Sequence, residues 1–228
     1  MLAPIHAQIL PWLRTYRWRL AVLFACVFAP LYLFGAIAED VVEKESFFLD
    51  RYLLSFMHAH ATALLDRVML FFSLIGSGLW LVPVDVGILL ILAWRRRWGD
   101  AFFWGLAVGG AALLNVGAKH TFGRVRPDLW PSIAPETTFS FPSGHAVQTM
   151  ALVAALLVLA WPTRWRWPTL IVGGCFVLLV GLSRVYLGVH YPSDVLAGWA
   201  ASLAWVFGLS ILLYGRMTKH TRHAAPAQ

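Results

Sequence analysis

Charged residues are scarce in this chain of 228 residues: only 13% are Asp, Glu, Lys or Arg, whereas 60% are hydrophobic. A soluble domain usually carries about 25% charged residues. Several apolar runs instead approach the ~20 residues that cross a bilayer. We therefore expect an all-helical (all-α) polytopic membrane protein, and the length leaves no room for a sizeable soluble domain.

Cysteine is also scarce, since Cys26 and Cys175 are the only two and both lie inside apolar runs. This placement argues against a disulfide or a metal site, and we expect two buried, small hydrophobic side chains. Acidic residues are outnumbered, because 18 Lys and Arg against 11 Asp and Glu give a net charge of +7. Most of the cations flank apolar runs, as expected of cytoplasmic loops, so we expect a lipid bilayer and no nucleic acid as partner.

The apolar runs predict six transmembrane helices, at residues 20–38, 77–94, 101–118, 145–161, 170–186 and 194–214. The sequence Ala36-Ile37-Ala38 resembles a signal-peptide cleavage site, but the first run is longer than the ~7–15 residues of a signal core. A retained helix is favoured. Residues 20–214 then form one membrane domain, between a cytoplasmic or interfacial N-terminus (1–19) and a cytoplasmic tail (215–228).

Acidic residues concentrate in the segment 39–62, where apolar residues alternate with them. This pattern predicts one or two amphipathic helices on the outer membrane face, between the first and second spans. A helical turn or two at the interface is expected before the second span. His58 and His60 point to different sides of a helix, so we interpret them as surface residues and not as metal ligands.

Asp85 lies within the second predicted span. An intramembrane carboxylate indicates a function by default, but a cap or an ion pair near a helix end also explains it, and we favour the structural interpretation. Gly105, Gly109 and Gly110 in the third span are small enough for close helix packing.

Arg and Lys residues beside the apolar runs are expected on the cytoplasmic side, which places both termini and the turns 95–98 and 163–167 in the cytoplasm. The segments 39–76, 119–142 and 184–193 then lie outside. Four cations run against the charge rule because they lie in the last two of these segments: Lys119, Arg124, Arg126 and Arg184. This exception indicates that they bind something.

The first polar cluster holds Lys119 and Arg126. The compact charge of the Lys119 ammonium group and the planar set of donors on the Arg126 guanidinium group both suit phosphate oxygens. A basic loop alone also fits the binding of lipid headgroups. Arg124 either adds charge to the site or only contacts headgroups.

The second cluster, Pro142 to His145, precedes an apolar helix. Ser143 has the chemistry of a helix N-cap, and Gly144 lets a ligand approach the backbone. The amides of a helix N-terminus bind anions, although an ordinary capped helix start explains the same residues. His145 favours the functional interpretation, because a histidine beside an anion is suited to general acid catalysis.

The third cluster places His190 and Asp194 four residues apart at the start of the sixth helix, with Pro192 in its first turn. A carboxylate there can accept a hydrogen bond from one imidazole nitrogen and leave the other free to attack. Arg184 offers a further guanidinium group that can bind phosphate. A purely structural His–Asp contact at a loop end remains the alternative.

Together the clusters resemble the type 2 phosphatidic acid phosphatase (PAP2) superfamily, and in particular its bacterial membrane lipid phosphatases. The family signature is K-x6-RP, PSGH and SR-x5-H-x3-D. It matches here at Lys119 with Arg126-Pro127, at Pro142 to His145, and at Ser183-Arg184 with His190 and Asp194. The motifs occupy residues 119–194.

The resemblance implies a role for each matching residue. His190 becomes the nucleophile that forms a phosphohistidine, Asp194 orients it, and His145 protonates the leaving oxygen. The phosphate-binding residues are Lys119, Arg126, Arg184, Ser143 and Gly144; Ser183 has no assigned role. No metal or other cofactor is implied, and the rate should depend on pH in a bell shape.

The leading hypothesis is therefore a lipid phosphatase of the cell (inner) membrane whose site faces outward. Undecaprenyl diphosphate is the first candidate substrate, followed by phosphatidylglycerophosphate and phosphatidic acid. A lipid phosphotransferase uses the same chemistry. Two other classes stay open, namely a transporter of phosphorylated solutes, for which no inverted repeat is apparent, and a non-catalytic protein that binds headgroups.

Overall fold

A computed structural model describes residues 21, 23–44 and 47–223, with side chains as far as residue 214. Every regular element in this part of the chain is a helix, as the sequence predicts. The elements are η1 (Phe24–Phe28), α2 (Ala29–Glu43), α3 (Phe48–Ala59), α4 (Ala63–Ile75), α5 (Gly78–Trp94), α6 (Trp98–Trp104), η2 (Gly105–Gly109), α7 (Gly110–Phe122), α8 (Gly144–Ala160), α9 (Arg166–Tyr186) and α10 (Pro192–His223). The predicted segment 1–19 lies outside the described residues.

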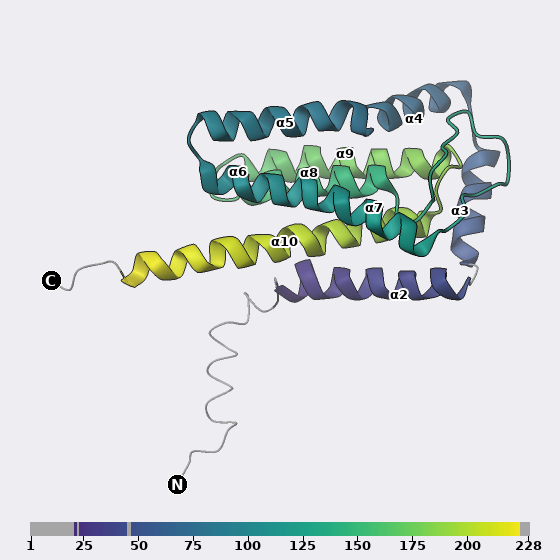
Figure 1. Ribbon diagram of the computed structural model, residues 1–228. Helices are drawn as coiled ribbons and strands as arrows, with labels where there is room; N and C mark the ends of the chain where they lie inside the picture. The colour runs from purple at the N-terminus through teal and green to yellow at the C-terminus, as the bar shows by residue number, and fades with distance from the viewer. Residues whose placement is uncertain (1–20, 22, 45–46, 224–228) are drawn as a thin grey trace, which may run out of the picture.

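The long helices run side by side along one axis, and α3 stands across one end of the bundle, next to the loop that joins α7 to α8 (Figure 1). Helix α8 packs against α5, α7, α9 and α10 and is the central helix. Small residues such as Ala151 and Ala155 are completely buried on it. They pack with Phe103, Trp104 and Val206 in the largest hydrophobic cluster.

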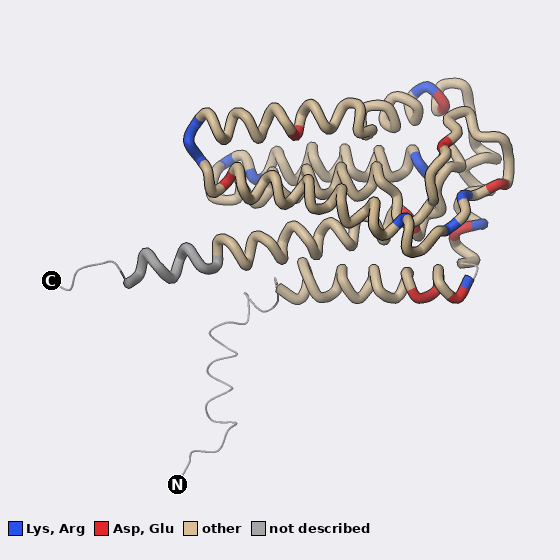
Figure 2. Tube along the Cα trace, in the orientation of Figure 1, with Lys and Arg blue, Asp and Glu red and all other residues tan. Residues whose placement is uncertain are grey.

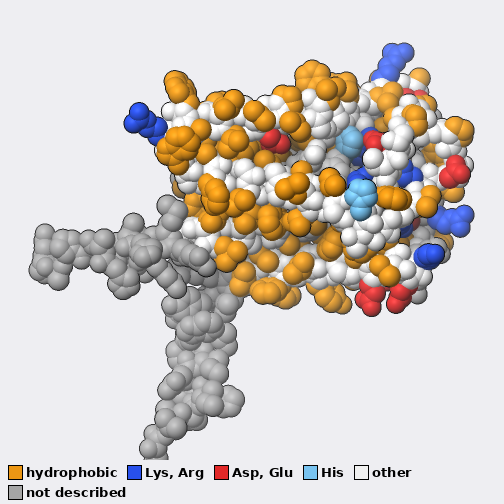
Figure 3. Space-filling model, viewed as in Figure 1, with side chains coloured by type: hydrophobic (Ala, Val, Ile, Leu, Met, Phe, Trp, Pro, Cys, Tyr) orange, Lys and Arg blue, Asp and Glu red, His pale blue; other side chains and the backbone are white. Residues whose placement is uncertain are grey.

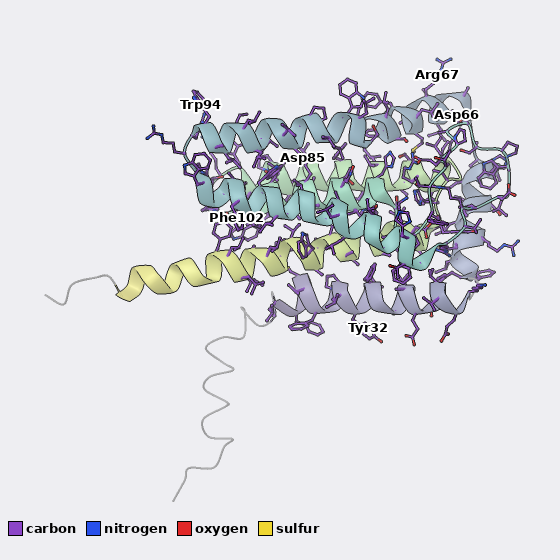
Figure 4. The ribbon with its side chains drawn as sticks, viewed as in Figure 1. Tyr32, Asp66, Arg67, Asp85, Trp94 and Phe102 are labelled. Atoms are coloured by element: carbon purple, nitrogen blue, oxygen red, sulfur yellow. The ribbon has the colours of Figure 1, made fainter. Side chains whose placement is uncertain are left out.

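The outer surface of the bundle is apolar along its length (Figure 3). Tyr32 on α2 points away from the bundle and is 80% exposed (Figure 4), and Phe102 on α6 is 60% exposed. In the described part of the chain, charged residues gather towards the two ends of the bundle (Figure 2), and Asp85 lies near the middle (Figure 4). Large apolar side chains on an outer surface are stable in lipid but not in water, so the protein is an integral membrane protein.

Among the described residues, four helical segments are long and apolar enough to cross a membrane: Phe24–Glu43, Trp98–Phe122, Arg166–Tyr186 and Pro192–Tyr214. Helices α4 and α5 form a fifth span if they are taken together, with a bend of 40° between them. Helix α8 is a shorter apolar helix of 17 residues. Helix α4 has 13 residues, which is more than the turn or two that the sequence predicts.

Several predicted boundaries are wrong because helices continue beyond their apolar runs. Helix α7 extends to Phe122 and ends at Gly123, whose φ is 56°, so Lys119 lies in its last turn and not in a loop. Helix α9 begins at Arg166, inside the predicted turn 163–167. Helix α10 begins at Pro192, as predicted for its first turn, but continues into the predicted tail as far as His223.

The acidic segment 39–62 contributes only one separate helix, α3. The first part of this segment belongs to α2, which ends at Glu43 and is followed by Lys44 with a φ of 58°. Helix α3 is amphipathic in an unusual sense, because it exposes Phe48 and Tyr52 and buries Asp50. Aromatic side chains of this kind are typical of the interface between membrane and water, and α3 lies where the sequence predicts an interfacial helix.

Three smaller predictions can be compared with the structure. His58 and His60 are exposed, which confirms them as surface residues. Cys175 is exposed on α9, so the prediction that both cysteines are buried is wrong. Asp85 lines a groove beside Trp104, and its Oδ1 is buried without a hydrogen-bond partner among the described residues; the expected cap or ion pair is not found.

Close packing between α7 and α10 depends on Gly110. A Cβ atom there would lie 2.5 Å from the ring of Trp205, whose indole nitrogen donates to the carbonyl of Leu106 at 3.0 Å. Gly109 has no neighbour within 4 Å of such an atom, and at Gly105 the nearest atom is 4.0 Å away. The predicted role in close packing therefore holds for Gly110 but not for Gly105 or Gly109.

Gly110→Ala should lower the stability of the bundle by about 1–3 kcal/mol, because the indole of Trp205 must move. Gly109→Ala is the matched control and should be neutral or stabilising by ~0.5–1 kcal/mol, since alanine favours a helix over glycine. Thermal unfolding in detergent measures both. Equal unfolding midpoints for the two variants would contradict the close contact.

Candidate active site

The three polar clusters of the sequence meet at one end of the bundle. Helix α7 ends just after Lys119, α8 begins at Gly144, and α9 ends just after Arg184. His190 lies in the short connection between α9 and α10. Figure 2 shows the charged residues of this end close to the loop between α7 and α8.

His190 and Asp194 are almost completely buried, with exposed fractions of 1% and 0%. Nδ1 of His190 lies 3.4 Å from Oδ2 of Asp194, which is long for a hydrogen bond. The same oxygen accepts hydrogen bonds from the amide of Tyr191 at 2.9 Å and from the hydroxyl of Ser140. These contacts hold the carboxylate beside the imidazole ring.

Nε2 of His190 faces the cations. It lies 3.0 Å from Nη1 of Arg126, and because a guanidinium group only donates, Nε2 accepts and the ring proton lies on Nδ1. Burial lowers the pKa of His190 to about 4, although the Asp194 carboxylate acts in the opposite direction. His190 is therefore a neutral imidazole at neutral pH.

Lys119 and Arg126 are oriented by the loop between α7 and α8. Nζ of Lys119 donates to Oγ1 of Thr138 at 2.9 Å and to the carbonyl of Phe139 at 2.6 Å. Nε of Arg126 donates to the carbonyl of Thr138 at 2.6 Å, and its Nη1 donates to that of Val189 at 2.7 Å. These partners are neutral oxygens, so they fix both cations without neutralising them.

Arg184 is 1% exposed and lies in the last turn of α9. Its guanidinium group donates to the hydroxyl of Ser73 and pairs with Glu136. Its Nε is buried without a partner among the described side chains. The other carboxylate oxygen of Glu136 lies 3.7 Å from Nη2 of Arg126. A carboxylate therefore lies between two of the cations that the sequence assigns to phosphate.

Ser143, Gly144 and His145 form the start of α8, as predicted. The side chain of Ser143 makes no capping hydrogen bond, so the prediction of a side-chain cap is wrong. Its Oγ is buried, and no described residue hydrogen-bonds to it. The amides of a first helical turn have no partner within their helix. Ser143 and these amides are thus available to a ligand.

Arg124 belongs to the site and not to the headgroup region. Its side chain is 14% exposed, with Nη1 2.5 Å from Oδ1 of Asp194 and Nη2 3.1 Å from Oδ2 of Asp50. The headgroup interpretation is therefore wrong. Ser183 donates from its hydroxyl to the carbonyl of Val180 at 2.6 Å, so its side chain is satisfied within its own helix.

Sequence reasoning missed Asp50, Glu136 and Ser140 as members of the site. No fixed spacing connects these residues to the three motifs. The one signal was composition, since Glu136 is an acidic residue among basic ones and Asp50 belongs to the acidic segment 39–62.

Comparisons with known proteins agree with the geometry. A family model described as the PAP2 superfamily matches residues 100–218. Phosphatidylglycerophosphatase B of Bacillus subtilis is 36% identical over 148 residues, which cover 63% of this chain and 72% of the relative. Undecaprenyl-diphosphatase of Sulfolobus acidocaldarius is 30% identical over 201 residues, which cover 86% of this chain and 90% of the relative.

A solved structure shares the fold as well. It is the crystal structure of a transmembrane PAP2-type phosphatidylglycerolphosphate phosphatase from Bacillus subtilis, with a TM-score of 0.65 and 31% sequence identity, over 83% of this chain and 96% of that one. The resemblance inferred from the three motifs is confirmed, and this chain belongs to the PAP2 superfamily, among its membrane phosphatases.

Proposed function

We propose that this protein removes a phosphate group from a phosphorylated membrane lipid by way of a phosphohistidine. The observation that best supports this is the buried, neutral imidazole of His190, whose Nε2 faces Arg126 at the polar end of an apolar bundle. Glu136 gives further support, because a carboxylate already pairs there with Arg184. A phosphate group has the charge and the oxygens to take its place.

In the first step Nε2 of His190 attacks phosphorus, and the bond from phosphorus to the leaving oxygen breaks. His145 gives its proton to that oxygen. Asp194 stabilises the positive charge that the imidazole ring acquires. The products are the phosphohistidine and either a lipid alcohol or, from a diphosphate, a lipid monophosphate.

In the second step a water molecule attacks phosphorus, and His145 accepts its proton. The bond between Nε2 and phosphorus breaks, which releases inorganic phosphate and restores neutral His190. A lipid hydroxyl in place of water would make the protein a phosphotransferase by the same chemistry.

Five groups are proposed to hold the phosphoryl oxygens: the side chains of Lys119, Arg126, Arg184 and Ser143 and the amide of Gly144. Phosphoryl transfer depends mainly on positioning and on the stabilisation of charge. The three cations supply the charge, and fixed donors directed at the oxygens need little reorganisation during the reaction.

A lipid substrate is supported by an apolar groove of about 630 Å³ between α2, α7 and α10. Its walls include Leu31, Phe34, Leu114 and Trp205. The groove reaches Asn115, whose side-chain amide donates to the carbonyl of Pro142 at 3.2 Å. It therefore ends beside the first residues of α8 and can hold a hydrocarbon chain near the phosphate-binding groups.

We propose undecaprenyl diphosphate as the first substrate to test. The undecaprenyl-diphosphatase of Sulfolobus acidocaldarius supports this choice, because its match covers 86% of this chain. Phosphatidylglycerophosphate follows, supported by the more similar relative from Bacillus subtilis, and phosphatidic acid comes next. Release of inorganic phosphate from a panel of these lipids identifies the substrate, and a transporter would release none.

We also propose six spans, with α4 and α5 as one bent span and α8 as the fourth. Support comes from the charge distribution, since Arg95, Arg96 and Arg97 lie at the end of α5 opposite to the site. The positive-inside rule puts that end and both termini in the cytoplasm. The site then faces the outside of the cell membrane.

Phosphate release should continue in the presence of a chelator such as EDTA, because Lys119, Arg126 and Arg184 supply the charge that a metal ion supplies elsewhere. The measurement is the initial rate with and without the chelator. Loss of activity that added Mg²⁺ restores would contradict a metal-independent mechanism.

The pH dependence of kcat/KM should show an acid limb well below pH 6.5, the ordinary pKa of histidine, because burial lowers the pKa of His190 to about 4 and the neutral ring is the nucleophile. Rates must first be corrected for the second ionisation of the phosphate ester, at about pH 6. A corrected acid limb at pH 6.5 or above would contradict the assignment.

Glu136→Gln should strengthen inhibition by inorganic phosphate, because a neutral amide no longer competes for Arg184 and Arg126. A partly exposed ion pair such as Glu136 with Arg184 contributes ~0.5–1 kcal/mol, so its removal should lower the inhibition constant of inorganic phosphate about two- to five-fold. Asp128→Asn is the matched control, since Asp128 is an exposed acid of the same loop. An unchanged or larger inhibition constant for Glu136→Gln would show that Glu136 does not occupy the phosphate position.

A further inference from the structure

The partners of Asp194 divide between its two carboxylate oxygens. Oδ2 faces His190, the amide of Tyr191 and the hydroxyl of Ser140. Oδ1 accepts a hydrogen bond of 2.5 Å from Nη1 of Arg124. Arg124 thus pairs with the carboxylate on the side away from the imidazole.

Arg124 is itself fixed from several directions. Nη1 also donates to Oγ of Ser193 at 2.8 Å, and Nη2 donates to Oδ2 of Asp50 at 3.1 Å. Its guanidinium carbon lies 4.1 Å from the centre of the Tyr191 ring. Pairing with two carboxylates and stacking on an aromatic ring together hold the planar guanidinium group in one orientation.

Asp50 connects this arginine to α3. It is a buried residue of the first turn of that helix. Its Oδ1 accepts from the amide of Ser193 at 2.9 Å, and its Oδ2 accepts from the hydroxyl of Ser193 at 2.5 Å. Asp50 therefore holds both Arg124 and the residue that precedes Asp194.

We propose that Arg124 and Asp50 are positioning residues, which keep the Asp194 carboxylate ionised and aligned with His190. The interfacial helix α3 then contributes to the reaction through Asp50. The inference rests on the proposed function, because Asp194 needs this alignment only if His190 becomes positively charged during catalysis.

The electrostatics explain why two acids and one arginine are needed. A buried carboxylate is costly unless it is paired and hydrogen-bonded, so Asp194 requires a cation. One cation, Arg126, already lies 3.0 Å from Nε2 of His190. Arg124 adds no second cation beside the ring, because it pairs with Oδ1, the carboxylate oxygen away from the imidazole. Asp50 pairs with the other amino group of Arg124.

The test compares Arg124→Gln with Arg51→Gln in the full-length protein in detergent. Arg51 is an exposed residue of α3 next to Asp50, so its substitution removes the same charge from the same region. Hydrolysis of a phosphorylated lipid gives kcat and KM, quenched-flow trapping gives the rate of phosphohistidine formation, and the thermal midpoint reports folding.

Arg124→Gln should lower kcat and the rate of phosphohistidine formation by about 10- to 100-fold, the size of effect found when a residue that orients a metal-ligating side chain is removed. KM should change by less than about two-fold, since Arg124 does not touch the substrate. Asp50→Asn should act in the same direction by a smaller factor. Arg51→Gln should match the parent.

Arg124→Lys keeps the charge near Asp194 but cannot reach Asp50 at the same time. Its kcat should lie between those of the parent and Arg124→Gln, and it serves as the test if Arg124→Gln does not fold. The inference is overturned if either Arg124 variant retains the parent kcat, if the loss is confined to KM, or if Arg51→Gln loses as much. A parent protein that releases no phosphate from any lipid overturns the proposed function and this inference together.

Discussion

The buried charge of Asp194 is the interaction on which the site depends. This carboxylate has an exposed fraction of 0%, and a buried charge is stable only where partners compensate it. The partners come from different places in the chain: His190 from the connection before α10, and Arg124 and Ser140 from the start and the end of the loop between α7 and α8. Asp50 on α3 in turn pairs with Arg124. Compensation of one charge therefore fixes the relative positions of these elements.

The apolar bundle determines where this network can lie. Its helices bury their contacts around α8 and expose apolar side chains along their length, so the charged residues of the described part of the chain, apart from Asp85, lie at or near the ends. At the end that holds the site, Lys119, Arg126 and Arg184 converge where helices terminate. Backbone carbonyls orient the first two, and Glu136 pairs with the third. The outcome is a positively charged site at the boundary of the membrane domain.

The helical class, the membrane location and the meeting of the three clusters followed from the sequence, because apolar runs fix the helix axes and the motifs lie at helix ends. Details within one helical turn did not follow. Lys119 lies in a helix because α7 continues beyond its apolar run. The pairing of Arg124 with Asp50 depends on how α3 docks, which no local pattern records. For the same reason the sequence did not reveal that Ser143 lacks a capping bond or that Glu136 reaches Arg184.

The central claim is that His190 carries the phosphoryl group. The most direct measurement is to incubate the purified protein with a phosphate-labelled lipid, quench it in alkaline denaturant and locate the label by peptide mass spectrometry. Label on His190 in the parent protein, with neither label nor turnover in His190→Ala, is the predicted result. Label on another residue, or substantial turnover by His190→Ala, would contradict the account.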